Sequence, residues 1–237
     1  MTYKSFMTKT LFLIIFAFWP MALVAQNQQA ASPESKLIQF QMAILKRGPK
    51  WSAAPDSALR KHHVDYAHSL LSSGKAVIAG PFSDNSDFAG VYIFRTQSAD
   101  EAKAWAMADP LVVNQLVVPE LHPWWAEDVM KKAETSQKLV TVYLAFLVRG
   151  EKWTAEKTPQ TEEIQKAHLA NIGRLAEMKK LVVAGPFGDN GNLRGIFVFR
   201  VSSLEEARTL TLTDPAVQAG RLALDLHPWL VPEGILP

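Results

Sequence analysis

Two segments of the chain, about a hundred residues apart, alternate apolar residues with other residues. Every second residue is apolar from Ile38 to Ile44 and again from Val140 to Phe146. A period of two is typical of a β-strand. In each predicted strand one face is fully apolar and the other is mixed. The polar side chains on the mixed faces are Gln39, Gln41, Thr141 and Tyr143.

The residues that follow each of these strands recur at helical spacing. The stripe of each predicted helix contains a histidine, and its members are Leu59, His63, Tyr66 and Leu70 in the first helix and Ile164, His168, Asn171 and Leu175 in the second. Two short apolar strands, another helix and a last strand ending at His-Pro-Trp follow in both halves. Each half therefore predicts the order β-α-β-β-α-β of a ferredoxin-like α+β unit.

The two halves are copies of one unit. A displacement of 105 residues aligns Lys61–Trp124 with Lys166–Trp229 without a gap, and about 24 of these 64 positions are identical, as in an internal repeat. The heptapeptide AGPFSDN at 79–85 returns as AGPFGDN at 184–190. We expect repeat 1 at 37–130, a linker at 131–138 and repeat 2 at 139–237.

A four-stranded sheet with both helices on one face leaves its other face uncovered. We expect the uncovered face to be the mixed one, and the repeats to pack sheet to sheet through it as an internal pseudo-dimer. The polar side chains named above would then line a partly polar interior with room for a small-molecule ligand. Further self-association stays open.

Residues 1–25 belong to neither repeat and have the order of a secretory signal. Two lysines precede an apolar run at 11–18, and small residues follow up to Ala25. We expect cleavage after Ala25, a flexible leader at 26–36, and a protein that is exported to the periplasm or secreted. The alternative is an uncleaved N-terminal anchor, which is the only membrane attachment that we expect.

Composition narrows the classes of function. The formal net charge is +2 and there is no cysteine. A chain this close to neutrality, without a dense basic patch, argues against nucleic acid as a partner. Disulfides, thiolate catalysis and cysteine-based metal sites are excluded. The sequence has no HExxH or other dense metal-ligand spacing, no phosphate loop and no dinucleotide fingerprint, so we expect neither a metal nor a cofactor.

One histidine lies on the buried stripe of the first helix in both repeats, His63 and His168, and an Asp-Pro pair follows the second helix, at Asp109 and Asp214. Both helices lie on the same sheet face, so each aspartate can approach its histidine. A carboxylate that orients a histidine and raises its basicity is a recurrent catalytic pairing. The alternatives are a core histidine held by one hydrogen bond and an aspartate that caps a helical turn.

Further candidates for binding a substrate follow the first strand and end the last strand. They are Arg47, Trp51 and His122 in repeat 1 and Arg149, Trp153 and His227 in repeat 2. The arginines with their tryptophans suit a substrate carboxylate, or else they form a solvated loop whose tryptophan covers the core. The two histidines either reach a pocket or close the edge of the sheet.

Taken together, these motifs resemble the YCII-related domains. The resemblance rests on the helix histidine in KHHVDYAHSLLSSGK and KAHLANIGRLAEMKK, on AGPF-DN and on the DP after the second helix, and it covers 37–125 and 139–230. It implies a ferredoxin-like α+β unit that pairs into a dimeric α+β barrel. It also implies a His–Asp pair as the candidate for catalysis, here His63 with Asp109 and His168 with Asp214. A few relatives are lyase-type enzymes that act on small aromatic substrates.

Two hypotheses about function follow. The first is an exported enzyme, lyase- or isomerase-like, that uses a His–Asp acid/base pair on a small organic molecule. The second is a non-catalytic envelope protein that binds a ligand or a partner through the same scaffold. The distance within each His–Asp pair, and the space around it, distinguish the two hypotheses.

Overall fold

The computed structural model describes residues 36–131 and 138–237. The expected signal segment, nearly all of the leader and most of the linker lie outside the described residues. Repeat 1 contains β1 (Leu37–Arg47), α1 (Ser57–Ser72), β2 (Ala76–Pro81), β3 (Phe88–Phe94), α2 (Ala99–Met107), α3 (Pro110–Val113) and β4 (Val117–Glu127). Repeat 2 contains β5 (Leu139–Arg149), α4 (Pro159–Glu177), β6 (Leu181–Pro186), β7 (Leu193–Phe199), α5 (Leu204–Thr211), α6 (Pro215–Gln218) and β8 (Leu222–Pro232).

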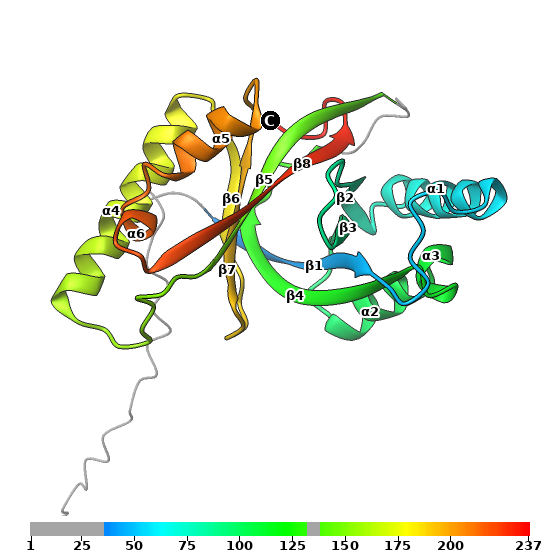
Figure 1. The fold of residues 1–237 in the computed structure, drawn as a ribbon, viewed down its shortest axis with the longest axis horizontal. Coiled ribbons are helices and arrows are strands. Elements are labelled where there is room, and N and C mark those ends of the chain that lie inside the picture. The colour runs from blue at the N-terminus through cyan, green and yellow to red at the C-terminus, as the bar shows by residue number, and fades with distance from the viewer. Residues whose placement is uncertain (1–35, 132–137) are drawn as a thin grey trace, which may run out of the picture.

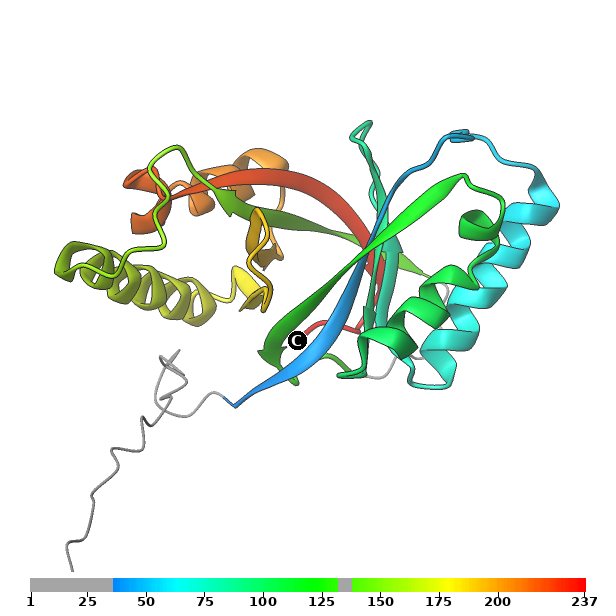
Figure 2. The same ribbon diagram turned by 90° about the horizontal axis from the view of Figure 1, so that it is seen from below.

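Each repeat forms one antiparallel four-stranded sheet. The strand orders are β2-β3-β1-β4 and β6-β7-β5-β8, which is the predicted ferredoxin-like topology. The two sheets meet in the centre of the molecule, and the helices of each repeat lie on the outer side of their own sheet (Figure 1). The view turned by 90° shows the same arrangement (Figure 2). The prediction of two ferredoxin-like repeats in an internal α+β barrel is confirmed.

The mixed faces of β1 and β5 lie under the helices, so the predicted orientation of the sheets is wrong. Gln41 is 2 % exposed, and its amide donates to the carbonyl of Gln97 just before α2 at 3.0 Å. On β5, Leu147 belongs to a core cluster with Leu175 of α4 and Ala216 of α6. The mixed face is therefore the one covered by helices and loops, and Gln41 finds its partner there.

The fully apolar faces meet between the sheets. Phe146 of β5 contacts Phe82 and Phe88 of repeat 1, with ring centroids 6.1 and 5.3 Å apart. The backbone groups of the central strands already pair within each sheet, so a polar side chain in this layer is costly to bury unless the opposite repeat supplies its partner, as Asp84 does for His227. This explains why the sheets join through their apolar faces.

The repeated heptapeptide joins the repeats reciprocally. The indole of Trp124 in repeat 1 donates to the carbonyl of Gly185 at 3.1 Å, and the indole of Trp229 in repeat 2 donates to the carbonyl of Gly80 at 3.0 Å. A Cβ atom at Gly185 would lie 1.9 Å from the carbonyl oxygen of Trp125. Glycine is therefore required here by the close approach of β6 to β4.

Among the residues that the structure describes, no helix combines the length and the hydropathy needed to cross a bilayer.

Candidate functional site

The structure brings His168 and Asp214 together in repeat 2. His168 projects from α4, and its Nδ1 lies 2.7 Å from Oδ2 of Asp214. Asp214 is fully buried at the N-cap of α6, where its Oδ1 accepts the backbone N–H of Ala216 at 2.9 Å. Both roles of this aspartate therefore hold at once: one carboxylate oxygen caps the short helix and the other accepts the imidazole N–H.

Local sequence explains the position of the carboxylate. Pro215 stands at the first helical position of α6, where its missing N–H costs nothing and its fixed φ begins the helix. Asp214 is thereby held in an extended conformation (φ −73°, ψ 124°). Asn171, one turn after His168, adds a longer contact of 3.4 Å from its amide to Oδ2. The carboxylate is therefore fixed before any ligand arrives.

Repeat 1 has the same pair, with a tyrosine as the additional partner of the aspartate. Nδ1 of His63 lies 2.9 Å from Oδ2 of Asp109, and the hydroxyl of Tyr92 donates to the same oxygen at 2.7 Å. Burial and the charge of Asp109 raise the pKa of Tyr92, which keeps the hydroxyl protonated as a donor. The residue at the position of Tyr92 in repeat 2 is Phe197. Asp214 therefore has no phenol competing with its histidine.

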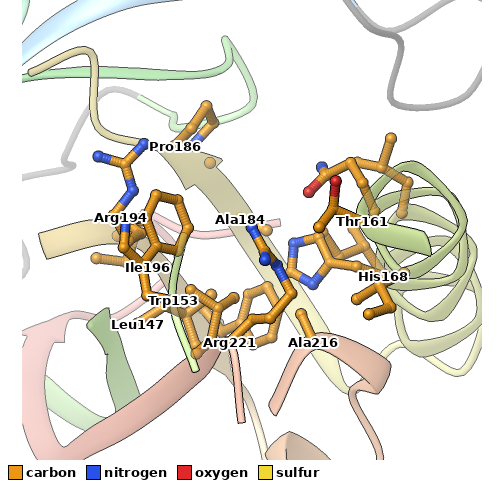
Figure 3. A pocket seen from close by; sticks show the side chains of 18 of the residues that line it. Leu147, Trp153, Thr161, His168, Ala184, Pro186, Arg194, Ile196, Ala216 and Arg221 are labelled. Atoms are coloured by element: carbon orange, nitrogen blue, oxygen red, sulfur yellow. The ribbon is translucent and has the colours of Figure 1, made fainter. Parts of the chain in front are cut away.

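A cavity of about 310 Å³ adjoins His168 in repeat 2. Its walls come from α4, from β6 and β7 and from the loop that carries Trp153, so it lies on the helix side of the sheet and not between the two sheets. Figure 3 shows His168 on the helix at one side of the cavity and Arg194 at the other. Within the described residues, Nε2 of His168 makes no hydrogen bond and is left to the cavity.

Trp153 also lines the cavity and lies among three guanidinium groups. The guanidinium carbons of Arg194, Arg221 and Arg149 are 4.7, 5.3 and 5.4 Å from the centroid of its ring. Arg194 and Arg221 line the cavity as well. Sequence analysis selected Arg149 and Trp153 but missed the other two arginines, because they have no counterpart in repeat 1.

The corresponding candidates of repeat 1 form a simpler contact. Arg47 lies over the ring of Trp51 at 4.9 Å, and Trp51 is 36 % exposed. Trp153 is only partly exposed. The same two residue types are thus placed at the surface in repeat 1 and against a cavity in repeat 2.

His122 and His227 lie at the junction of the repeats and do not line the cavity of repeat 2. Nδ1 of His122 is 2.6 Å from Asp189, and Nδ1 of His227 is 2.7 Å from Asp84. Each aspartate belongs to the AGPF-DN loop of the opposite repeat. Burial alone would raise the pKa of Asp84, but hydrogen bonds from His227 and Ser86 outweigh it and hold this pKa below its usual value.

These two contacts between the repeats explain why the heptapeptide occurs twice. Its glycine receives the indole of the other repeat, and its aspartate receives the histidine of the same His-Pro-Trp segment. Each copy needs the other copy to complete this contact. Sequence analysis missed the partners Asp84 and Asp189, although the repetition of the loop was a signal for them.

Across the described ranges 36–131 and 138–237, no group of three or more His, Asp or Glu side chains is arranged to hold a metal ion.

The fold and the site define a single-chain α+β barrel protein with a carboxylate-backed histidine beside a cavity. The chain belongs to the YCII-related domain family, whose model matches residues 40–124 and 143–229. It is 34 % identical over 76 residues to the uncharacterized protein YjpA of Bacillus subtilis (strain 168), an alignment that covers 30 % of this chain and 87 % of YjpA.

Two solved structures share the arrangement of the whole barrel. A chlorite dismutase from Candidatus Nitrospira defluvii matches with a TM-score of 0.54 and 12 % identity, over 84 % of this chain and 93 % of that chain. A heme-binding protein from Thermus thermophilus matches with a TM-score of 0.50 and 12 % identity, over 84 % of this chain and 92 % of that chain. At this identity the likeness shows the fold alone, a scaffold that supports enzymes and ligand-binding proteins.

Proposed function

We propose that the protein is an enzyme in which His168 and Asp214 act as an acid/base pair on a small organic molecule bound in the cavity of repeat 2. The observation that carries this proposal is the unequal use of the two ring nitrogens. Nδ1 is fixed by a buried carboxylate at 2.7 Å, and Nε2 faces the cavity without a protein partner among the described residues. His122 and His227 also have Nδ1 on an aspartate, but their Nε2 atoms are buried at the junction of the repeats, whereas Nε2 of His168 has a cavity beside it for a ligand.

The proposed chemistry begins with the neutral imidazole. Nδ1 carries the proton and donates it in a hydrogen bond to Asp214, so Nε2 carries the lone pair and accepts a proton from the ligand. The imidazolium that forms is stabilised by the adjacent carboxylate. In an isomerase-like reaction it returns the proton to another atom of the ligand. In a lyase-like reaction the bond to the leaving group breaks as a double bond forms, and the imidazolium gives its proton to the departing group or to water.

Proton exchange tests this proposal even though the product of the reaction is unidentified. Small organic molecules with an acidic C–H are incubated with the protein in D2O, and loss of the C–H signal is followed by ¹H NMR. His168→Asn should lower the exchange rate by about 10²–10⁴, the usual contribution of a general base. His62→Asn changes an exposed histidine of α1 and is the matched control. His63→Asn measures what the pair of repeat 1 contributes.

An exchange rate in His168→Asn equal to that of the wild type would refute the proposal. The proposal would also be refuted if the wild type exchanged no C–H group of any molecule tested and His168→Asn differed from it only in lower stability. That result would favour the alternative, a non-catalytic protein that uses the pair to hold α4 on α6.

Heme is a second candidate ligand, because the structurally similar protein from Thermus thermophilus binds it. One feature of the site fits: a histidine whose free nitrogen faces a cavity while its other nitrogen is held by a carboxylate is the usual arrangement of a metal-bound histidine. His168 would hold the heme through its iron, and heme would supply redox chemistry. A hemin titration monitored by absorbance, in wild type and His168→Asn, tests this. A band shift present only in the wild type would favour heme.

We also propose that the enzyme works outside the cytoplasm. This proposal rests on the order of basic, apolar and small residues in 1–25, which is that of a secretory signal.

A further inference from the structure

Three arginines around Trp153 have no anionic partner in the described part of the protein. Their hydrogen bonds go to neutral oxygens: Arg194 to the carbonyl of Asp189 at 3.2 Å, Arg149 to the carbonyl of Asn190 at 2.6 Å, and Arg221 to the hydroxyl and carbonyl of Thr154. Within residues 36–131 and 138–237, none of the three forms an ion pair with a carboxylate within 4.0 Å. The three positive charges therefore have no carboxylate in direct contact, although the more distant carboxylate of Asp189 offsets part of the charge at Arg194.

The local electrostatics make this cluster of positive charges unfavourable by itself. Burial lowers the pKa of Arg194, and the neighbouring charge of Arg149 lowers it further, and together they outweigh the opposing effect of the Asp189 carboxylate. Stacking on Trp153 compensates in part, because the face of an indole attracts cations. A bound anion would neutralise these positive charges, which otherwise repel one another.

The fold does not require these arginines. The residues at the positions of Arg194 and Arg221 in repeat 1 are Ala89 and Leu116, and repeat 1 has the same strands and helices. The two cations therefore belong to repeat 2 alone, where they line the cavity beside His168.

We infer that the cavity of repeat 2 binds a small organic anion, with its charged group at Arg194 and Arg221. Planar guanidinium groups match the oxygen atoms of a carboxylate or phosphate in paired hydrogen bonds. The remaining walls include Trp153, Ile164, Ile172 and Phe197, which suit an apolar body. Such a ligand would reach across the cavity toward Nε2 of His168.

This inference rests on the proposed function in one respect, namely that the anion is the substrate of the His168–Asp214 pair. The pairing of a cationic anchor with a base would hold an organic acid in one orientation. A fixed orientation is a large part of what a general base needs to act on one particular C–H.

Benzoate is the probe, and benzyl alcohol is its neutral analogue of similar size. Binding of each to the full chain is measured by ligand-observed NMR titration at low ionic strength. We expect saturable binding of benzoate at least about 10-fold tighter than that of benzyl alcohol, since a charge-assisted hydrogen-bonded pair typically contributes that much or more. Inorganic phosphate should compete if the anionic group alone is recognised.

The variants Arg194→Ala and Arg221→Leu introduce the residues that repeat 1 already carries. Each should weaken benzoate binding about 10-fold or more and leave benzyl alcohol unchanged. Arg208→Ala removes an exposed positive charge of α5 outside the cavity and is the matched control. Melting temperatures verify that the variants fold, and Arg194→Gln replaces Arg194→Ala if the latter does not.

Benzoate that binds no tighter than benzyl alcohol, shows no saturation, or binds equally to Arg194→Ala and Arg221→Leu would overturn the inference. His168→Asn separates it from the proposed function. If this variant retains benzoate binding and the wild type exchanges no C–H, the anion site stands and the acid/base enzyme does not. If the wild type exchanges C–H groups and benzoate binds no tighter than benzyl alcohol, the enzyme stands and the anion site does not.

Discussion

Gly185→Ala should destabilise the protein strongly, although it adds a single methyl group. The new Cβ would lie 1.9 Å from the carbonyl oxygen of Trp125, and Cβ atoms essentially never approach a non-bonded heavy atom within 3.0 Å. The strands β6 and β4 would therefore have to separate by at least about 1 Å, since the obstructing atom belongs to the backbone and cannot rotate away.

The cost has two parts. Overpacking of a closely packed interior typically costs about 1–3 kcal/mol. Separation of the strands also stretches the hydrogen bond from the Trp124 indole to the Gly185 carbonyl, which adds about 1 kcal/mol. We expect a loss of about 2–4 kcal/mol. For a protein of this size, that lowers the melting temperature by about 5–15 °C.

Gly173→Ala is the matched control. Gly173 lies in α4, and no atom lies within 4 Å of a Cβ placed there. Alanine should raise the free energy of unfolding by about 0.5–1 kcal/mol through helix propensity. Thermal unfolding followed by circular dichroism, with urea titration for the free energies, compares both variants with the wild type. Equal stability of Gly185→Ala and Gly173→Ala would refute the argument that the repeats approach too closely for a side chain.

Three further predictions concern separate features. The lowered pKa of Asp84 means that its ionised form stabilises the folded protein above the unfolded carboxyl pKa of about 4, and that this contribution disappears as the pH falls. Asp84→Asn should therefore lose less stability than the wild type between about pH 6 and pH 3, as measured by calorimetry, and parallel curves would contradict this. Tyr92→Phe removes one donor to Asp109 and should lower the free energy of unfolding by about 1–3 kcal/mol, whereas an unchanged urea midpoint would show that the hydroxyl contributes nothing. Intact-mass measurement on protein from its native envelope should give an N-terminus near Gln26, and a full-length mass would favour the uncleaved anchor.

The order of the elements could be predicted from the sequence because the repeat supplied each signal twice. Period-two strands, histidine-bearing helices and Asp-Pro turns recur at one displacement, so a weak local pattern in one copy is supported by the other. The approach of His63 to Asp109 and of His168 to Asp214 followed from placing both helices on one sheet face, and the structure has both contacts.

The orientation of the sheets could not be predicted from alternation alone. A strand with one apolar and one mixed face is compatible with two arrangements. The mixed face can lie under helices, or it can pack against another sheet. The orientation of each sheet is determined by tertiary contacts, such as the hydrogen bond from Gln41 to the carbonyl of Gln97. Such a contact joins residues that are far apart in the sequence. Arg194 and Arg221 were not predicted, because the candidates were chosen from residues that the two repeats share. These two arginines are present in repeat 2 only.

The reciprocal contact between the heptapeptide loops and the His-Pro-Trp segments also changes how the barrel responds to dilution. Two separate chains joined by such an interface would obey mass action and dissociate below their dimer dissociation constant. Here a single polypeptide carries both partners, so their encounter is intramolecular and its effective concentration is set by the connecting segment. The assembled barrel should accordingly have a melting temperature that does not depend on protein concentration.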